Sequence, residues 1–193
     1  MVKPQQIGKI ELVVGPMFSG KSEWIVGKLR AHQIANHFIL AIRFLGDERY
    51  NKDSITSHNG SRFLAQSAKT VVDIERLLKE NPKLEVLAID EIQFFDPSLS
   101  KLLQKEQRRG VQIYVSGLDL DFLGQPWETT NQVFAIADSV EKKLAVCSIC
   151  KKINATRSQR LIQGKPASKD SPRVLIDGTD SYSARCLAHY EIR

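Results

Sequence analysis

The sequence predicts an α/β fold with a mostly parallel sheet, followed by a small metal-binding domain. Short apolar runs alternate with helical patterns, a glycine-rich phosphate motif joins the first run to the first helix, and cysteines gather only after this alternation ends. The 193 residues suffice for one domain and a small appendage. We therefore expect a nucleotide-binding core over residues 1–144 and a metal-binding domain over residues 145–193.

The first half of the chain follows the order strand, loop, helix, strand. Lys9–Val14 is an apolar run that ends at a Gly-Pro turn, which predicts a strand. Ser22–Asn36 carries apolar residues near helical spacing, and Phe38–Phe44 again resembles a strand. A polar stretch around Asp47–Arg62 follows.

The alternation continues through the middle of the chain. Thr70-x-x-Asp73 predicts a capping box that starts a helix ending at Asn81-Pro82, and Leu84–Ile89 predicts a buried strand. Asp96-Pro97 predicts an N-cap followed by proline at the first helical position. That helix covers Ser98–Arg109 and stops at Gly110, and Val111–Val115 predicts the next strand.

Composition places the chain among ordinary globular proteins. It is 42% hydrophobic and 26% charged, which excludes disordered and collagen-like classes. No apolar run approaches the ~20 residues of a membrane helix, and the first residues lack a secretory apolar region. Three cysteines cannot form a closed set of disulfides. We expect a cytoplasmic protein without a membrane partner.

The net charge of +6 is concentrated in one window. Glu141–Arg173 holds nine basic residues against Glu141 and Asp170. Such a patch attracts phosphates of nucleotides or nucleic acids, although a solvated surface is an equally good interpretation. The basic residues are Lys142, Lys143, Lys151, Lys152, Arg157, Arg160, Lys165, Lys169 and Arg173.

The glycine-rich motif fits the G-x-x-x-x-G-K-[ST] phosphate loop. It follows a predicted strand and opens a predicted helix, so backbone N–H groups and the helix N-terminus can surround anionic oxygens. Lys21 would reach the β- and γ-phosphates of ATP, and Ser22 would ligate Mg²⁺. The alternative is a glycine-rich turn with a surface lysine. The predicted nucleotide contacts are Gly15, Pro16, Met17, Phe18, Ser19, Gly20, Lys21 and Ser22.

Two carboxylates end the predicted strand that runs to Ile89. Asp90 and Glu91 lie at the carboxyl edge, where open α/β sheets bind ligands. Successive strand residues face opposite ways, so the two should have different roles. Asp90 suits Mg²⁺, and Glu91 suits a nucleophile that is either water, as in an ATPase, or a substrate hydroxyl, as in a kinase. The alternative is an acidic strand end that caps the next segment.

The cysteines have the spacing of a structural zinc site. Cys147-x-x-Cys150 is followed after 35 residues by Cys186-x-x-His189. Three thiolates and one imidazole leave no open position, so the metal would be structural and would staple a long loop. The alternative is three buried reduced cysteines beside a surface histidine. The other histidines, at positions 32, 37 and 58, show no such pairing and are expected at the surface or in turns.

These motifs together resemble the type II thymidine kinases, cytosolic and bacterial, over nearly the whole chain, from Gly8 to His189. The octapeptide Gly15–Ser22, the string Ile89–Phe95 and the paired Cys/His ligands carry the resemblance. Further matches follow in chain order: Asp47–Tyr50 to D-x-R-[YS], Gly117–Phe122 to G-L-D-x-x-F, Arg157–Leu161 to R-[ST]-Q-R-L, and Val174–Tyr182 to the lasso before the second metal pair.

The resemblance implies a fold and an activity. The core would be RecA-like, and a zinc-held lasso would close over the nucleoside. The reaction would transfer the ATP γ-phosphoryl group, with Mg²⁺, to the 5′-hydroxyl of thymidine or deoxyuridine, a salvage step for DNA precursors. Members are usually homotetramers, and inhibition by thymidine triphosphate (dTTP) is expected.

The resemblance also implies residue roles. Glu91 matches the general base, Asp90 the magnesium-side carboxylate, and Arg49 the residue near the transferring phosphate, so the catalytic set is Glu91, Arg49 and Lys21. Asp47, Arg49, Asp90 and Gln93 join the phosphate loop as ATP-side residues. The nucleoside would contact Met17, Phe122, Ser158, Arg173, Val174, Leu175, Ile176, Asp177 and Tyr182, with Arg173–Asp177 acting through its backbone.

The chain departs from the family pattern at Ile92, at Asp177-Gly178 and at Gln125–Thr130. Two other function classes stay open: an ATPase that binds nucleic acid through the basic window, and a nucleotide-binding module without turnover. The window has almost no aromatic residues for base stacking, so we expect no nucleic-acid partner.

Overall fold

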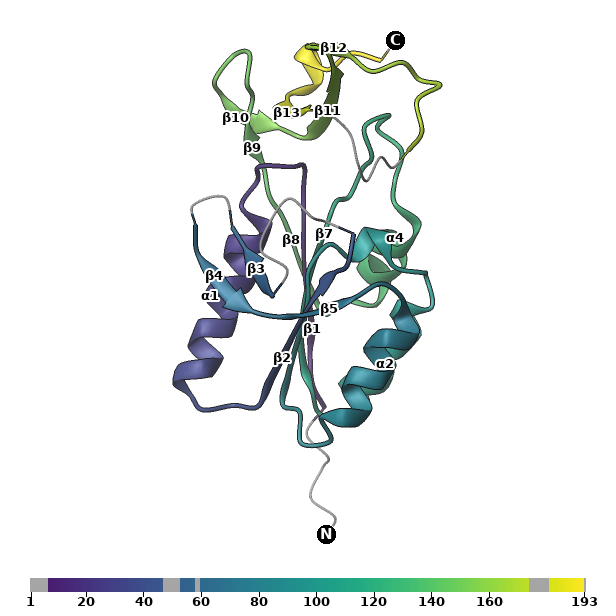
Figure 1. The fold of residues 1–193 in the computed structure, drawn as a ribbon. Helices are drawn as coiled ribbons and strands as arrows, with labels where there is room; N and C mark the ends of the chain where they lie inside the picture. Colours follow the sequence, from purple (N-terminus) through teal and green to yellow (C-terminus); the bar gives the residue numbers. More distant parts are fainter. Residues whose placement is uncertain (1–6, 47–52, 58–59, 174–180, 193) are drawn as a thin grey trace.

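A parallel sheet with helices on both faces forms the larger part of the molecule (Figure 1). The computed structural model describes residues 7–46, 53–57, 60–173 and 181–192. The first half of this part contains β1 (Ile10–Val14), α1 (Lys21–Ile34), β2 (Ile39–Phe44), β3 (Ser54–Thr56), β4 (Arg62–Leu64), β5 (Gln66–Ala68), α2 (Val71–Glu80) and β6 (Val86–Ile89). It continues with a 3₁₀ helix (Ile92–Phe94), α3 (Leu99–Arg108), β7 (Gln112–Gly117), α4 (Glu128–Ile136) and β8 (Ser139–Lys142).

The strand order of the main sheet is β5-β2-β6-β7-β1-β8, and every neighbouring pair is parallel. The predicted α/β class with a mostly parallel sheet is therefore confirmed. Because all strands run the same way, the phosphate motif after β1, the carboxylates after β6 and the loop after β7 reach one edge of the sheet. The chain enters β1 at the opposite end of the sheet (Figure 1).

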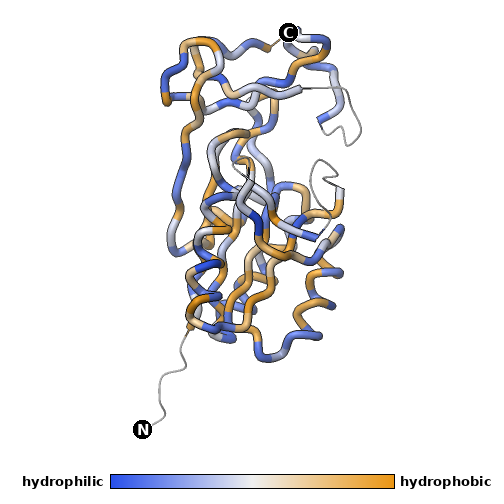
Figure 2. The backbone as a smooth tube through the Cα atoms, turned by 60° about the vertical axis from the view of Figure 1, so that its left-hand side comes forward, coloured by the Kyte–Doolittle hydropathy of each residue, from blue (hydrophilic) through white to orange (hydrophobic). Residues whose placement is uncertain are grey.

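Alternate residues of each strand build two separate cores. Ile113 and Val115 pack on the face covered by α2, α3 and α4, whereas Tyr114 between them packs on the face covered by α1. The predicted helical residues Ile25 and Leu29 are fully buried on the α1 face. Figure 2 shows the same pattern, since the strands in the middle of the molecule are coloured hydrophobic.

The start of α3 differs from the prediction. Asp96 accepts a hydrogen bond from the Ser98 backbone N–H (2.9 Å), but Ser98 is the N-cap and the helix begins at Leu99. Asp96 and Pro97 therefore form a preceding turn, in which the Leu99 N–H bonds to the Asp96 carbonyl. The capping box of Thr70 and Asp73 at the start of α2 is confirmed.

The C-terminal segment, residues 145–193, has its own small strands above the carboxyl edge of the main sheet (Figure 1). It contains β9 (Ala145–Val146), β10 (Ile153–Ala155), β11 (Arg157–Ile162), β12 (Lys165–Pro166), β13 (Ser181–Arg185) and a 3₁₀ helix (Leu187–His189). β9 pairs with β10, while β11 lies between β12 and β13. The sequence pattern did not predict these strands because they are short and lack apolar alternation.

Two histidines expected at the surface contact each other there: His37 is exposed and His32 is half-buried. His32 and His37 share a hydrogen bond (2.7 Å), and the second ring nitrogen of His32 bonds to the Tyr114 hydroxyl (2.8 Å). Burial, together with the neighbouring His37, lowers the pKa of His32. This cluster lies on the α1 side of the sheet, and His58 lies outside the described residues. Among the helices of the described residues, none is long and apolar enough to span a membrane.

Candidate active site and metal centre

The phosphate motif forms the loop between β1 and α1 that its spacing predicts. Gly15 (φ 147°) and Gly20 (φ 81°) adopt positive φ, and a Cβ on Gly15 would lie 2.5 Å from the Lys143 carbonyl oxygen. Lys21 is only 6% exposed, and its Nζ donates to the Pro16 carbonyl inside the loop (2.8 Å). Ser22 follows in the first turn of α1. The lysine is thus held within a loop whose backbone can surround phosphate oxygens.

The two carboxylates after β6 have different surroundings, as predicted. Asp90 is buried and accepts hydrogen bonds from the Ser116 hydroxyl and from the Glu91 N–H. Glu91 leaves the strand in the left-handed conformation (φ 59°). A non-glycine residue at this φ is uncommon, and such residues are enriched at functional sites.

Gln93 holds Glu91 in place. The Gln93 Nε2 donates to the Glu91 carboxylate, and the Gln93 Oε1 accepts from the Leu118 N–H after β7 (3.0 Å). Gln93 is buried, and both ends of its amide have hydrogen-bond partners, as buried polar groups require. The sequence could not show this bridge, because Leu118 is distant in the chain.

Three carboxylates act on the buried lysine. Burial lowers the pKa of Lys21, while the nearby charges of Glu91, Asp90 and Asp119 oppose that shift. Asp119 also pairs with Lys142 at the end of β8 (2.9 Å). Asp119 belongs to the G-L-D-x-x-F motif, but the sequence pattern did not identify it as a site residue. The cluster brings one buried cation and several acids to the same sheet edge, which is the charge pattern of a metal-nucleotide site.

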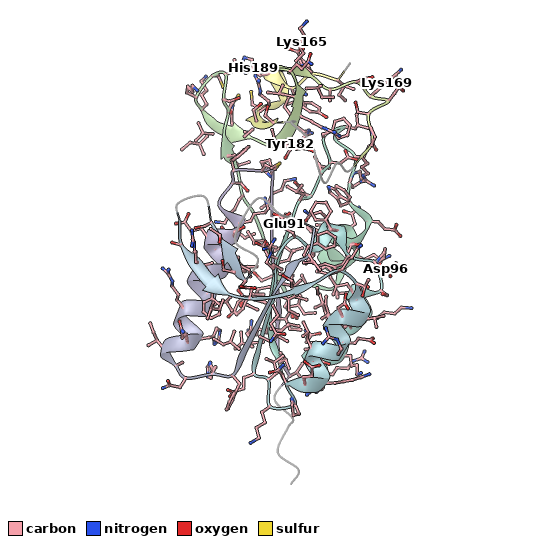
Figure 3. The ribbon with its side chains drawn as sticks, viewed as in Figure 1. Glu91, Asp96, Lys165, Lys169, Tyr182 and His189 are labelled. Carbon is pink, nitrogen blue, oxygen red and sulfur yellow. The ribbon has the colours of Figure 1, made fainter. Side chains whose placement is uncertain are left out.

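Several predicted nucleoside contacts lie where the C-terminal segment meets this edge of the sheet. The Met17 N–H donates to the Ser158 hydroxyl (2.9 Å), so the phosphate loop touches β11. Phe122 is buried, and its carbonyl accepts from the Tyr190 hydroxyl (2.6 Å). In Figure 3 Tyr182, on β13, lies between Glu91 and the region of His189.

Arg173, which is expected to contact the nucleoside through its backbone, has partners within the protein for its side chain. Its side chain forms an ion pair with Asp121 (2.7 Å) and donates to the Pro126 carbonyl (2.8 Å). Val174, Leu175, Ile176 and Asp177 lie outside the described residues, as do Asp47 and Arg49. Two departures from the family pattern have structural partners: Ile92 is fully buried in the core, and Trp127 stacks with Arg173.

The cysteines and His189 meet at one point. The ligand atoms of Cys147, Cys150, Cys186 and His189 all lie within 4.8 Å of one another. The His189 Nδ1 lies 3.1 Å from the Cys186 Sγ and 3.7 Å from the Cys147 Sγ. Ligands of a tetrahedral zinc ion lie about 3.3–3.8 Å apart. The cluster therefore fits a four-ligand zinc site.

The charges of the thiols also favour a cation. Burial opposes ionisation of Cys147, but the N–H groups of Cys150, Cys186 and Ile149 lower its pKa to about 5. Burial, together with the Cys147 side chain, raises the pKa of Cys186. One thiolate thus forms at neutral pH while its neighbour resists ionisation. A divalent cation removes this conflict by binding both sulfurs as thiolates.

Five of the nine basic residues in the basic window have partners within the protein. Lys142 pairs with Asp119, Lys143 with Glu141, and Arg173 with Asp121. Arg160 is fully buried and donates to the Pro172 carbonyl (2.6 Å), and Arg157 donates to the Thr156 carbonyl (3.1 Å). The other four basic residues, Lys151, Lys152, Lys165 and Lys169, are exposed, as are the ion-paired Lys142 and Arg173.

Comparisons with known proteins agree with one another. The family model described as thymidine kinase matches residues 8–190. A curated protein from Mesoplasma florum, named thymidine kinase, is 36% identical over 194 residues, which cover 99% of this chain and 95% of that protein. Both matches include the phosphate loop, the carboxylates after β6 and the four metal-site residues.

Proposed function

This chain belongs to the thymidine kinase family and phosphorylates thymidine with ATP in nucleoside salvage, and we propose that Glu91 is the base that takes the proton of the nucleoside 5′-hydroxyl. The observation that carries the proposal is the position of Glu91. It lies at the sheet edge beside the phosphate-loop lysine, and the Gln93 amide fixes its carboxylate. A fixed carboxylate near the transferred phosphoryl group can orient the attacking hydroxyl.

Charge neutralisation falls to the phosphate loop and its partners. Lys21 would exchange the Pro16 carbonyl for phosphate oxygens when ATP binds. Ser22 and Asp90 would hold Mg²⁺, which neutralises charge on the β- and γ-phosphates when bound. We assign Asp47 and Arg49 to the ATP-binding side only because they match the family motif.

The nucleoside would lie between the main sheet and the C-terminal segment. Phe122 and Tyr182 would enclose it, Met17 and Ser158 would face the thymine methyl group, and the backbone of Arg173–Asp177 would bind the imide edge. A backbone pattern that fits thymine leaves buried groups unpaired with cytosine, at about 1–3 kcal/mol each. We expect deoxyuridine to be accepted, because one methyl group contributes only ~1–3 kcal/mol.

We also propose the wider setting of the enzyme. The division into a core over residues 1–144 and a zinc-binding domain over residues 145–193 follows the change from the parallel sheet to small antiparallel pairs. A cytoplasmic location fits three thiols that must stay reduced to bind metal. The homotetramer and inhibition by dTTP rest on the family alone. Nucleic-acid binding is disfavoured, because five of the nine basic residues have internal contacts.

Nucleoside-dependent ADP release tests the function. With Mg-ATP, we expect release with thymidine, less with deoxyuridine, and none above background with deoxycytidine or without nucleoside. Release that ignores the nucleoside would instead indicate an ATPase. In that case binding of single-stranded DNA at several salt concentrations would test the exposed lysines of the basic window.

Replacement of Gln93 tests how Glu91 is held. Gln93→Leu keeps a similar volume but removes the donor to Glu91, so we expect kcat to fall about tenfold with both KM values within about twofold. Gln107→Leu is the matched control, because Gln107 donates to Asp138 at an exposed site on α3. A rise in the ATP KM with unchanged kcat would show that Gln93 serves ATP and not Glu91.

A further inference from the structure

Asp121 lies buried in the loop that joins β7 to α4. One carboxylate oxygen, Oδ1, accepts from the backbone N–H groups of Leu123 (2.9 Å) and Gln125 (2.8 Å). The other, Oδ2, faces the Nε of Arg173 at 2.7 Å. Asp121 is 3% exposed. Its own loop therefore fixes the carboxylate, and its free oxygen is directed at the C-terminal segment.

Arg173 makes three different contacts with the same loop. Besides the ion pair, its Nη2 donates to the Pro126 carbonyl (2.8 Å), and its guanidinium lies 4.1 Å from the centre of the Trp127 ring. A planar guanidinium can pair, donate and stack at once, whereas an ammonium group cannot. Stacking over indole is the strongest of the cation–π arrangements. This one side chain thus makes three contacts between the C-terminal segment and the loop.

These contacts surround Phe122. Phe122 follows Asp121 directly, its carbonyl is held by Tyr190, and the Arg160 guanidinium lies 5.1 Å from its ring centre. Arg160 in turn donates to Pro172, the neighbour of Arg173. Arg160 thus lies against the Phe122 ring, while Arg173 holds the preceding residue, Asp121.

The same contact reaches toward the catalytic carboxylate. Trp127 packs edge-on against Phe94, with ring centres 5.8 Å apart. Phe94 belongs to the 3₁₀ helix that also carries Gln93. The Glu91 side is nevertheless held independently, through Gln93 and Leu118. Loss of the Arg173 contact should therefore disturb Phe122 more than Glu91.

We infer that Asp121, Arg173 and Trp127 form a docking contact that positions Phe122 for the nucleoside and so determines the affinity for thymidine. The inference rests on the proposed role of Phe122 in enclosing the nucleoside. Asp121 and Arg173 are positioning residues here, because their side chains bind each other. ATP affinity and the chemical step depend on the phosphate loop and Glu91, which this contact does not touch.

A double-mutant cycle on thymidine kinetics tests the inference. Asp121→Asn keeps an oxygen for the two loop N–H groups but removes the ion pair, and Arg173→Gln removes all three contacts. We expect Asp121→Asn to raise the thymidine KM about tenfold, the loss of one charge-assisted contact, and Arg173→Gln to raise it at least as much. The double variant should resemble Arg173→Gln alone, because the pair acts as a unit. The kcat and the ATP KM should stay within about twofold.

Matched variants exclude a general loss of structure. Arg173→Lys keeps the charge without the planar stack, so its thymidine KM should lie between those of wild type and Arg173→Gln. If Arg173→Gln does not fold, Arg173→Lys takes its place in the cycle. Arg76→Gln removes an exposed ion pair on α2 and should change nothing. Effects that multiply in the double variant, an unchanged thymidine KM, or an equal rise in the ATP KM would each overturn the inference.

Tryptophan emission gives a readout that is independent of turnover. The chain has two tryptophans, so Trp24→Phe leaves Trp127 as the single emitter. In that background Arg173→Gln and Asp121→Asn should both shift the Trp127 emission, and Arg76→Gln should not. Unchanged emission in both variants would overturn the docking contact. An absence of thymidine-dependent turnover in the wild type would overturn the proposed function as well. Normal wild-type turnover, with an unchanged thymidine KM in the variants, would overturn this inference alone.

Discussion

Replacing Glu91 by glutamine is expected to lower kcat by about 10²- to 10⁴-fold, the contribution of a positioned general base. The amide keeps the size of the carboxylate but cannot take the proton of the attacking hydroxyl. The thymidine and ATP KM values should change little, since the interaction develops mainly in the transition state. Single-turnover measurements of thymidine monophosphate formation with saturating Mg-ATP would measure the chemical step directly.

The control for this variant is another glutamate of the same protein. Glu75→Gln lies on the exposed side of α2 and should have wild-type kinetics. A Glu91→Gln protein with normal kcat would remove the base from the mechanism. Loss of kcat together with a large rise in the ATP KM would instead place Glu91 among the groups that bind the nucleotide.

The charges of Glu91 and Lys21 interact at the sheet edge. Burial lowers the pKa of Lys21, and the carboxylates of Glu91, Asp90 and Asp119 oppose that shift without cancelling it. Removal of one carboxylate charge therefore weakens the support for the lysine that binds phosphate. Glu91→Gln leaves Asp90 and Asp119 in place, and both still raise the pKa of Lys21. We therefore expect a smaller effect on ATP binding than on kcat.

Local patterns predicted the parts of this molecule whose residues are close in sequence. The phosphate loop depends on the eight consecutive residues Gly15–Ser22, and the structure places them between β1 and α1 as expected. The metal ligands form two pairs with a fixed spacing, and all four meet. The capping box of α2 is equally local. Backbone chemistry within one turn is sufficient to specify such features.

Contacts between distant segments could not be derived from the sequence. Ser116 on Asp90, Leu118 on Gln93 and Arg173 on Asp121 join residues that only the strand order brings together. A parallel sheet of alternating apolar runs is compatible with several strand orders. The small strands of the C-terminal segment were missed because their residues are mostly polar, including the buried ones of β11. The apolar cluster beside these strands consists of alanines and cysteines, which give no apolar alternation.

Removal of zinc is expected to abolish thymidine binding while ATP binding is partly retained. The buried apolar cluster of the C-terminal segment consists of Ala145, Cys147, Ala155, Ala184 and Cys186, with Cys150 packed against it. Such small side chains bury little apolar surface, so the metal must supply most of the stability of this segment. The phosphate loop instead rests on the large core around β1 and α1. Chelation followed by separate titrations with thymidine and ATP would measure the two effects.

Thiol chemistry makes this experiment specific to the metal site. All three cysteines of the chain are proposed ligands, so no other thiol contributes to the signal. The native protein should contain one zinc per chain and resist a thiol reagent, and the chelated protein should expose three reactive thiols. Excess Mg²⁺ during the assay compensates for chelation of that ion, and added Zn²⁺ should restore thymidine binding. Clearly less than one zinc per chain would contradict the ligand assignment. Equal loss of ATP and thymidine binding would show that the metal supports the whole active site, because the Met17–Ser158 hydrogen bond would then transmit the collapse of the C-terminal segment to the phosphate loop.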